Sequence, residues 1–300
     1  MKKSALKRAA AIFFALALVL PVFMTPAAAL SAENVSYYDG TYSTDWYDGS
    51  PASGKIYHLN SAADLAGYVY LVNVANGGAS FGGCTIRLEC NVVWNTGNAS
   101  DWFDTAPTYT WQPISISQAH YSSAGFDGNG HYISGLYQKD DGANHTGFIG
   151  VHGGTDWGVK NLAIVNSFFC KTSSGGSQNG NYGVGVFMST PYNSFTFENL
   201  YTDAIVVDAS DNTGGIVGNP RSAGATLNVK NCVFAGRVIS TASNAGGMVG
   251  ASNSRNVNVT DCLNLGTVTA ASNAGGMIGL VSASSSATVR IGSSVNAGKV

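Results

Sequence analysis

The sequence is poor in charged side chains. Asp, Glu, Lys and Arg together make up 11% of its 300 residues, against roughly 25% in an ordinary soluble domain. Hydrophobic residues still make up 45%, and there are 38 glycines, so the composition is not that of a disordered chain. The polar residues are mainly Ser, Thr, Asn and Gly, which suits many short strands joined by turns.

Common catalytic and metal-binding motifs are also lacking. The sequence contains no His-Glu-x-x-His zinc motif, and no Gly-x-Ser-x-Gly nucleophile elbow stands between a predicted strand and a predicted helix. The glycine-rich stretches lack the Lys-Ser or Lys-Thr ending of a phosphate-binding loop, and the calcium-binding pattern Gly-Gly-x-Gly-x-Asp is absent. We therefore expect no metal ion and no cofactor.

Cysteine is scarce, and its spacing excludes two classes of small domain. The five residues, an odd number, fit neither a zinc site nor a disulfide-rich mini-domain. Two of them, Cys84 and Cys90, lie in one predicted strand about 20 Å apart, too far to bridge. Export would permit disulfides, and we expect most, though not all, of Cys84, Cys90, Cys170, Cys232 and Cys262 to be buried free thiols.

The only long apolar run lies at the N-terminus. Four basic residues precede an apolar stretch over 9–24, and the small residues Ala27 to Ala29 follow it. This order is typical of a secretory signal peptide, and the run is shorter than the ~20 residues that a spanning helix needs. We predict a signal peptide over 1–29 rather than a membrane anchor. The mature protein is then extracellular or at the cell surface, with no membrane insertion.

Removal of that segment leaves an acidic chain. Of the 15 Lys and Arg residues, 11 remain against 17 Asp and Glu, a net charge near −6. Nucleic acids and anionic membranes both favour basic surfaces. The charge therefore predicts no nucleic-acid partner.

The mature chain begins with two segments that carry no repeat. Residues 30–54 form an aromatic-rich N-terminal segment, and residues 55–110 read as a strand-helix-strand cap region. Ser61 is the predicted N-cap of the helix, with Asp64 three residues later. The apolar face of this helix would cover the end of whatever follows.

From 111 to 300 the chain is repetitive. The clearest copies of a Gly-Gly-x-Val/Ile-Gly motif are Gly214–Gly218, Gly246–Gly250 and Gly275–Gly279, spaced 32 and 29 residues apart. Each unit carries three strand-like pieces and no helix, which argues against helical solenoids, and the units are shorter than propeller blades. We predict an all-β fold, a right-handed parallel β-helix (β-solenoid) with one N-terminal capping helix.

One polar and one apolar position recur in each unit. Asn161, Asn199 and Asn231 occupy the same place, and Asp261 follows in line. Stacked coils would superimpose these side chains as a structural ladder at a corner, although a ligand-binding row is the alternative. Beside them an inward apolar ladder is expected from Leu162, Leu200, Cys232 and Cys262.

These segments resemble a known family. Trp111–Ile114, Gly125–Leu136, Thr146–Gly150 and Val159–Leu162, followed by the later glycine motifs, are similar to GLUG-motif repeat proteins. The resemblance covers most of residues 55–300. It implies secreted or wall-associated bacterial proteins and no settled biochemical activity.

The sequence offers weak candidates for catalysis. Asp140 and Asp141 lie near His145, but they stand in a loop where Asp is common for turn formation. Asp127 belongs to a Phe-Asp-Gly-Asn-Gly turn signature. A pair of carboxyl groups roughly 5–10 Å apart in a groove would favour a polysaccharide-active lyase or hydrolase.

Binding candidates are aromatic. Tyr42, Trp46, Trp102 and Trp111 fall in the first third of the chain and could stack on sugars or anchor a protein partner, or simply cover the end of the coils. Our first hypothesis is a non-catalytic structural or adhesion protein that binds extracellular glycans or a host or neighbouring surface protein. The second is a secreted polysaccharide-active enzyme. We also expect the repeats to continue beyond Val300.

Overall fold

The computed structural model describes residues between Asn34 and Val300. The described ranges are 34–75, 81–115, 124–140, 145–152, 157–172, 183–208, 212–220, 225–241, 243–253, 256–282 and 287–300. The predicted signal peptide over 1–29 and the candidate Asp141 lie outside the described residues.

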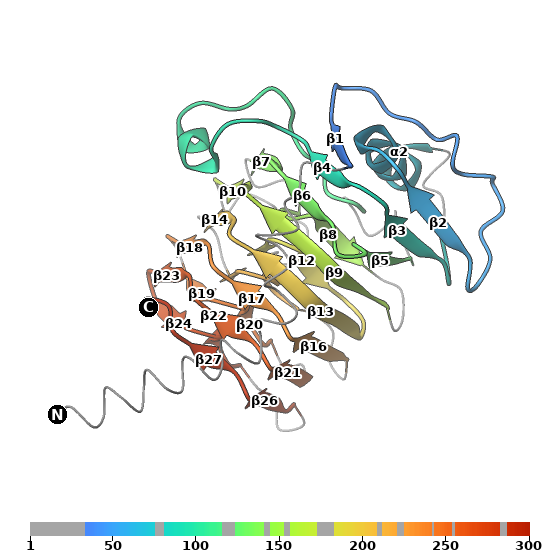
Figure 1. Cartoon of the computed structure of the whole chain (residues 1–300). Coiled ribbons are helices and arrows are strands. Elements are labelled where there is room, and N and C mark those ends of the chain that lie inside the picture. The colour runs from blue at the N-terminus through green and yellow to red at the C-terminus, as the bar shows by residue number, and fades with distance from the viewer. Residues whose placement is uncertain are drawn as a thin grey trace. The chain divides into compact units, whose positions relative to one another are not determined.

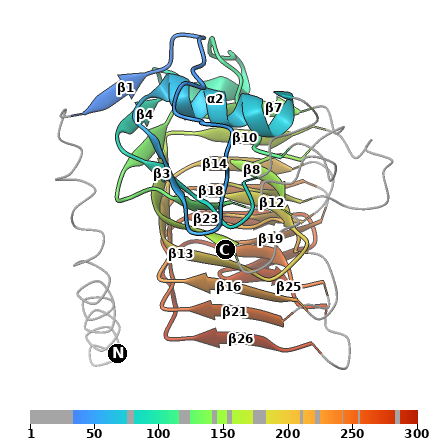
Figure 2. The same ribbon diagram turned by 90° about the vertical axis from the view of Figure 1, so that its right-hand side faces the viewer.

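The chain folds as a parallel β-helix, which confirms the predicted fold class. Strands of successive coils pair in parallel with their counterparts, so the coils stack as Figures 1 and 2 show. The longest sheet path contains β1 (Val35–Tyr37), β4 (Asn91–Val93), β6 (Tyr132–Ser134), β9 (Trp157–Val165), β13 (Phe195–Thr202), β16 (Thr226–Lys230), β21 (Asn256–Thr260) and β26 (Val289–Gly292). The same sheet includes β2 (Ile56–Leu59), β3 (Thr85–Leu88), β5 (Gly125–Asp127), β17 (Val233–Phe234), β22 (Leu263–Asn264) and β27 (Val295–Asn296).

The other sides of the coils form smaller sheets. One contains β7 (Tyr137–Asp140), β10 (Phe168–Lys171), β14 (Ile205–Asp208), β18 (Arg237–Ser240) and β23 (Thr267–Ala270). Another contains β11 (Val184–Gly185), β15 (Thr213–Gly214), β19 (Asn244–Gly246) and β24 (Asn273–Gly275). Two pairs remain, β8 (Ile149–His152) with β12 (Met188–Pro191), and β20 (Val249–Ala251) with β25 (Ile278–Leu280).

A complete coil has five short strands where the sequence suggested three pieces. The coil from β16 to β20 shows why, because two tight corners divide it further. At one corner Asn231 takes a left-handed conformation (φ 50°) between β16 and β17. At the other the glycine motif separates β19 from β20.

The glycine motif is required by close approach of the backbone. A Cβ atom on Gly246 would lie 2.0 Å from the carbonyl oxygen of Val249, within the same turn. A Cβ atom on Gly247 would lie 2.2 Å from the carbonyl oxygen of Gly276 in the next coil. No side chain fits at either position, which explains the repeated Gly-Gly pair.

A hydrogen-bonded amide ladder runs along the Asn231 corner. Asn199 Nδ2 donates to Asn161 Oδ1 at 2.9 Å, and Asn231 Nδ2 donates to Asn199 Oδ1 at 2.7 Å. All three residues are left-handed, and Asp261 adopts the same conformation one coil later (φ 55°). Asn tolerates this conformation better than most residues, so the ladder and the corner depend on the same side chain.

The ladder ends on the carboxylate of Asp127, which is buried. Asn161 Nδ2 donates to Asp127 Oδ1 at 3.0 Å, and Arg87 and Lys160 lie 3.3 and 3.7 Å from Asp127 Oδ2. Burial by itself would raise the pKa of Asp127. The hydrogen bonds from Asn161 and the Asn129 amide, with the charges of Lys160 and Arg87, lower this pKa below its ordinary value.

Further ladders follow other edges of the coils. Asn244 donates to Asn212 at 2.8 Å and Asn273 donates to Asn244 at 2.6 Å. Additional amide contacts join Asn253 to Asn219, Asn228 to Thr196, Asn258 to Asn228, and Asn264 to Asn296. Neighbouring coils are therefore joined through side chains as well as through backbone strands.

The interior of the coils is apolar. The expected inward row is buried at each position, and the five cysteines are free and buried. Fully buried phenylalanines fill the space between the sheets, among them Phe148, Phe169, Phe187, Phe197 and Phe234.

One α-helix, the only one in the described ranges, covers the first coil. Helix α2 (Ala62–Asn73) begins after Ser61, whose side chain accepts a hydrogen bond from the Asp64 amide at 3.1 Å. Its apolar side chains Leu65, Tyr68, Val69 and Val72, spaced i, i+3, i+4 and i+7, are buried. Figure 2 shows the helix across the end of the stack where β1 and β4 lie. The described residues contain no helix long and apolar enough to cross a membrane.

The first coil has an exchanged chain order. Strand β2 pairs with β3, but the upstream strand β1 pairs with β4. After β2 the chain forms α2 instead of continuing into the next strand of the coil. The upstream strand β1 occupies the position of that missing strand and pairs with β4. The amide of Ala62, at the helix start, bonds to Ser36 Oγ at 2.9 Å and joins the two segments.

Candidate functional site

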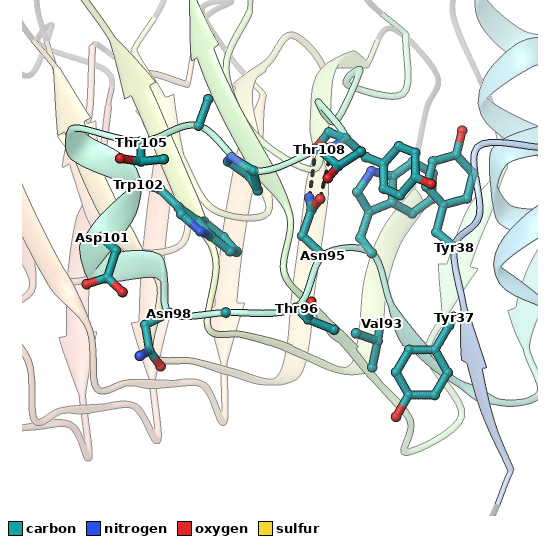
Figure 3. A pocket seen from close by; sticks show the side chains of 15 residues that line it. Tyr37, Tyr38, Val93, Asn95, Thr96, Asn98, Asp101, Trp102, Thr105 and Thr108 are labelled. Carbon is teal, nitrogen blue, oxygen red and sulfur yellow. Dashed lines mark hydrogen bonds between the residues drawn. The ribbon is translucent and has the colours of Figure 1, made fainter.

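A pocket of about 290 Å³ lies at the N-terminal end of the stack, between the ends of β1 and β4 and the segment 94–109. Figure 3 shows Tyr37 and Tyr38 on one side, Trp102 and Asp101 on the other, and Asn95 between them. The remaining lining residues are Val93, Trp94, Thr96, Gly97, Asn98, Thr105, Ala106, Pro107, Thr108 and Tyr109.

Asn95 closes the base of this segment. Its Nδ2 donates to the carbonyl oxygens of Tyr109 at 2.7 Å and Gly135 at 2.9 Å, and its Oδ1 accepts from the Tyr109 amide at 2.9 Å. One buried side chain thus joins the two ends of the segment to the neighbouring coil.

The far side of the pocket is fixed by η2 (Ala99–Phe103), a short 3₁₀ helix. Asn166 accepts from the Ala99 amide at 2.9 Å and donates to the Gly97 carbonyl at 2.7 Å. Phe103 packs edge-on against Phe168 with ring centroids 4.8 Å apart. These contacts hold Trp102 and Asp101 against the coils.

Stacked aromatic rings form the near wall. Tyr38 lies parallel to Trp94 with centroids 3.7 Å apart, and Tyr109 meets Tyr38 edge-on at 4.8 Å. Burial raises the pKa of Tyr38, and the nearby Tyr109 and Asp39 add to the effect, so its hydroxyl stays protonated at neutral pH. Tyr37, at the pocket edge, is 65% exposed.

One lining residue carries a buried donor without an acceptor in the described part of the chain. Trp94 is 5% exposed, and its Nε1 group has no hydrogen-bond acceptor among the described residues. Buried polar groups of native proteins normally have a partner. The lining combines ring faces, amides, hydroxyls and one carboxylate, a set suited to binding a neutral polar molecule by stacking and hydrogen bonds.

The four aromatic candidates from the sequence lie in different places. Trp102 lines the pocket. Tyr42 is 54% exposed and stacks on Tyr70 outside the pocket, while Trp46 packs on Tyr57, Tyr68 and Phe81 in the cap region.

Trp111 belongs to the core rather than to a binding surface. It is 1% exposed, stacks on Phe148 and donates its N–H to the Phe148 carbonyl at 3.2 Å. Its burial leaves no ring face for a ligand, because Phe148 stacks on it and Trp94 meets it edge-on.

The catalytic candidates do not form a described acid–base pair at a surface. Asp140 ends β7, beside Lys171 in register. His145 is 4% exposed, with Nδ1 3.4 Å from Oγ of the fully buried Ser189. Asp127 has a lowered pKa, whereas a general acid needs a raised one.

The pocket residues that the sequence did not single out are mostly short and polar. Asn95, Asn98, Thr105 and Thr108 lie in a segment without periodicity, so no pattern marked them. The only signal was the concentration of aromatic residues on both sides of it.

Fold and pocket define a parallel β-helix protein with a covered N-terminal end and a small aromatic site there. No protein-family model matches the chain, and a search of curated proteins finds no match. A solved structure from Bacteroides ovatus, provisionally described as an immunoglobulin A1 protease, is similar, with a TM-score of 0.58 and 20% identity. The similarity covers 82% of this chain and 66% of that one, and it shows the fold alone.

Proposed function

We propose that this chain is an exported bacterial surface or secreted protein of the GLUG-repeat type, and that its end pocket binds a glycan. In this proposal the β-helix is a rigid, non-catalytic support. The predicted signal peptide over 1–29 supports export, and the ordered repeats over 111–300 support the family resemblance.

The observation that carries glycan binding is the exposed ring of Tyr37 beside a polar pocket. The apolar face of a sugar stacks on an aromatic ring, while its hydroxyl groups bond to amides and carboxylates. Tyr37 offers the ring, and Asn98 and Asp101 offer the polar groups.

A glycan array followed by calorimetry on the best ligand tests this proposal. Tyr37→Ala should weaken binding at least about tenfold, the loss expected from an interfacial aromatic worth about 1.4 kcal/mol or more. Tyr42→Ala is the matched control, because Tyr42 is similarly exposed (54% against 65%) but lies outside the pocket.

Two results would overturn the proposal. One is the absence of any glycan ligand, and the other is an equal loss of affinity in both variants. Release of reducing ends or unsaturated sugars from a polysaccharide panel would instead show a polysaccharide-active enzyme.

A further inference from the structure

A second surface lies on the side of the coils, away from the end pocket. A hollow of about 900 Å³ crosses the outer face of β13, β16, β21 and β26, four strands that lie side by side in Figure 1. A neighbouring hollow of about 220 Å³ extends over β3, β5 and β9 and shares two lining residues with it, Thr196 and Glu198. Together they form what we call the lateral groove.

Two rows of outward side chains line the lateral groove along the stacking direction. Strand register places Thr196, Asn228, Asn258 and Arg290 in the first row, and the second contains Lys160, Glu198, Lys230, Thr260 and Gly292. In the first row Asn258 donates to Asn228 at 2.9 Å and Asn228 donates to Thr196 at 3.3 Å. The groups repeat at the ~4.8 Å spacing of neighbouring strands.

The part of the groove from β16 to β26 lies in the basic part of an acidic chain. Between Gly214 and Val300 there are six Lys and Arg residues but one acid, Asp261, while the whole sequence has a net charge of −2. Lys230 pairs with Glu198 at 2.9 Å. Arg290 is exposed and, within the described ranges, has no carboxylate partner.

We infer that the lateral groove binds a linear acidic polysaccharide that lies along the stacking axis. The amide and hydroxyl groups of the first row bond to sugar hydroxyls, and Arg290 and Lys230 attract the carboxylates of the polymer. A flexible nucleic acid is the poorer fit, because single-strand binders use aromatic stacking platforms and the described lining of the main hollow contains no aromatic residue.

Binding of polygalacturonate to the purified protein, measured by calorimetry at low and high salt, tests this inference. Arg290→Ala should weaken binding at least tenfold, and the affinity of the unmodified protein should fall as salt rises, since exposed charges are screened. Arg237→Ala is the matched control, because Arg237 is also exposed but lies on β18 in another sheet. Its affinity should stay within twofold, and circular dichroism should show that both variants fold.

The outcomes separate this groove from the end pocket. Tyr37→Ala should bind polygalacturonate normally, so failure of the pocket proposal leaves this one standing. No binding of polygalacturonate, an equal loss with Arg237→Ala, or a loss with Tyr37→Ala would overturn the inference. Tighter binding of single-stranded DNA than of polygalacturonate would also overturn it in favour of a nucleic acid.

Discussion

Replacement of Asn231 separates the two roles of the amide ladder. Asn231 donates to Asn199 at 2.7 Å and holds a left-handed corner at φ 50°. Leucine would lose the hydrogen bond, about 1 kcal/mol, and would meet the left-handed cost of roughly 1–2 kcal/mol. We therefore expect Asn231→Leu to lower the free energy of unfolding by about 2–3 kcal/mol.

Asn231→Gly is the informative comparison, because glycine adopts the left-handed conformation without that steric cost. It loses only the hydrogen bond, so the expected destabilisation is about 1 kcal/mol. Guanidinium denaturation followed by far-UV circular dichroism measures both variants. If Asn231→Leu were as stable as wild type, neither the hydrogen bond nor the left-handed backbone would contribute to stability. If the two variants lost equal stability, the left-handed conformation would carry no cost for leucine.

Two further perturbations test other features of the coils. The lowered pKa of Asp127 means that its contribution to stability is present above the unfolded value near 3.9 and is lost as the pH falls through the folded value. The stability difference between wild type and Asp127→Asn, measured by denaturation from pH 7 to 3, should therefore shrink below about pH 4, and a constant difference would show that the carboxylate is not stabilised by its partners. Gly247→Ala should lower the free energy of unfolding by at least about 1–3 kcal/mol, because its Cβ would lie 2.2 Å from the Gly276 oxygen. Gly292→Ala is the control, because the nearest atom to its Cβ would be Thr260 Cγ2 at 3.8 Å. This control should melt within about a degree of wild type. Equal melting temperatures for the two alanine variants would contradict the close approach.

The repeat pattern predicted the fold because each coil repeats the same local geometry. Asn199 and Asn231 could be aligned from the sequence alone, and the structure places them one above the other. Asn212, Asn244 and Asn273 also recur in the sequence, each two residues before a Gly-Gly pair, and the structure shows that they form a second ladder.

Other features depend on contacts that no local pattern encodes. The exchanged order of β1 and β2 is a long-range pairing choice, set by where α2 leaves the coil. Trp102 and Trp111 are both buried, at 4% and 1% exposure, and no local pattern shows that Trp102 lines a pocket while Trp111 stacks on Phe148 in the core.

The direction of the amide ladder has a consequence for how the coils assemble. Asn161, Asn199 and Asn231 each donate toward the preceding coil, and the series starts at the fixed negative charge of Asp127. Each finished coil thus presents a free acceptor to the coil that follows it in the sequence, so it acts as a template with a definite polarity. This polarity holds for the coils of Asn161, Asn199 and Asn231 and stops at Asp261, the next residue of the row, because a carboxylate cannot donate to Asn231 Oδ1. The amide row therefore couples only the first part of the stack, and the later coils depend on their strands and on the other amide ladders.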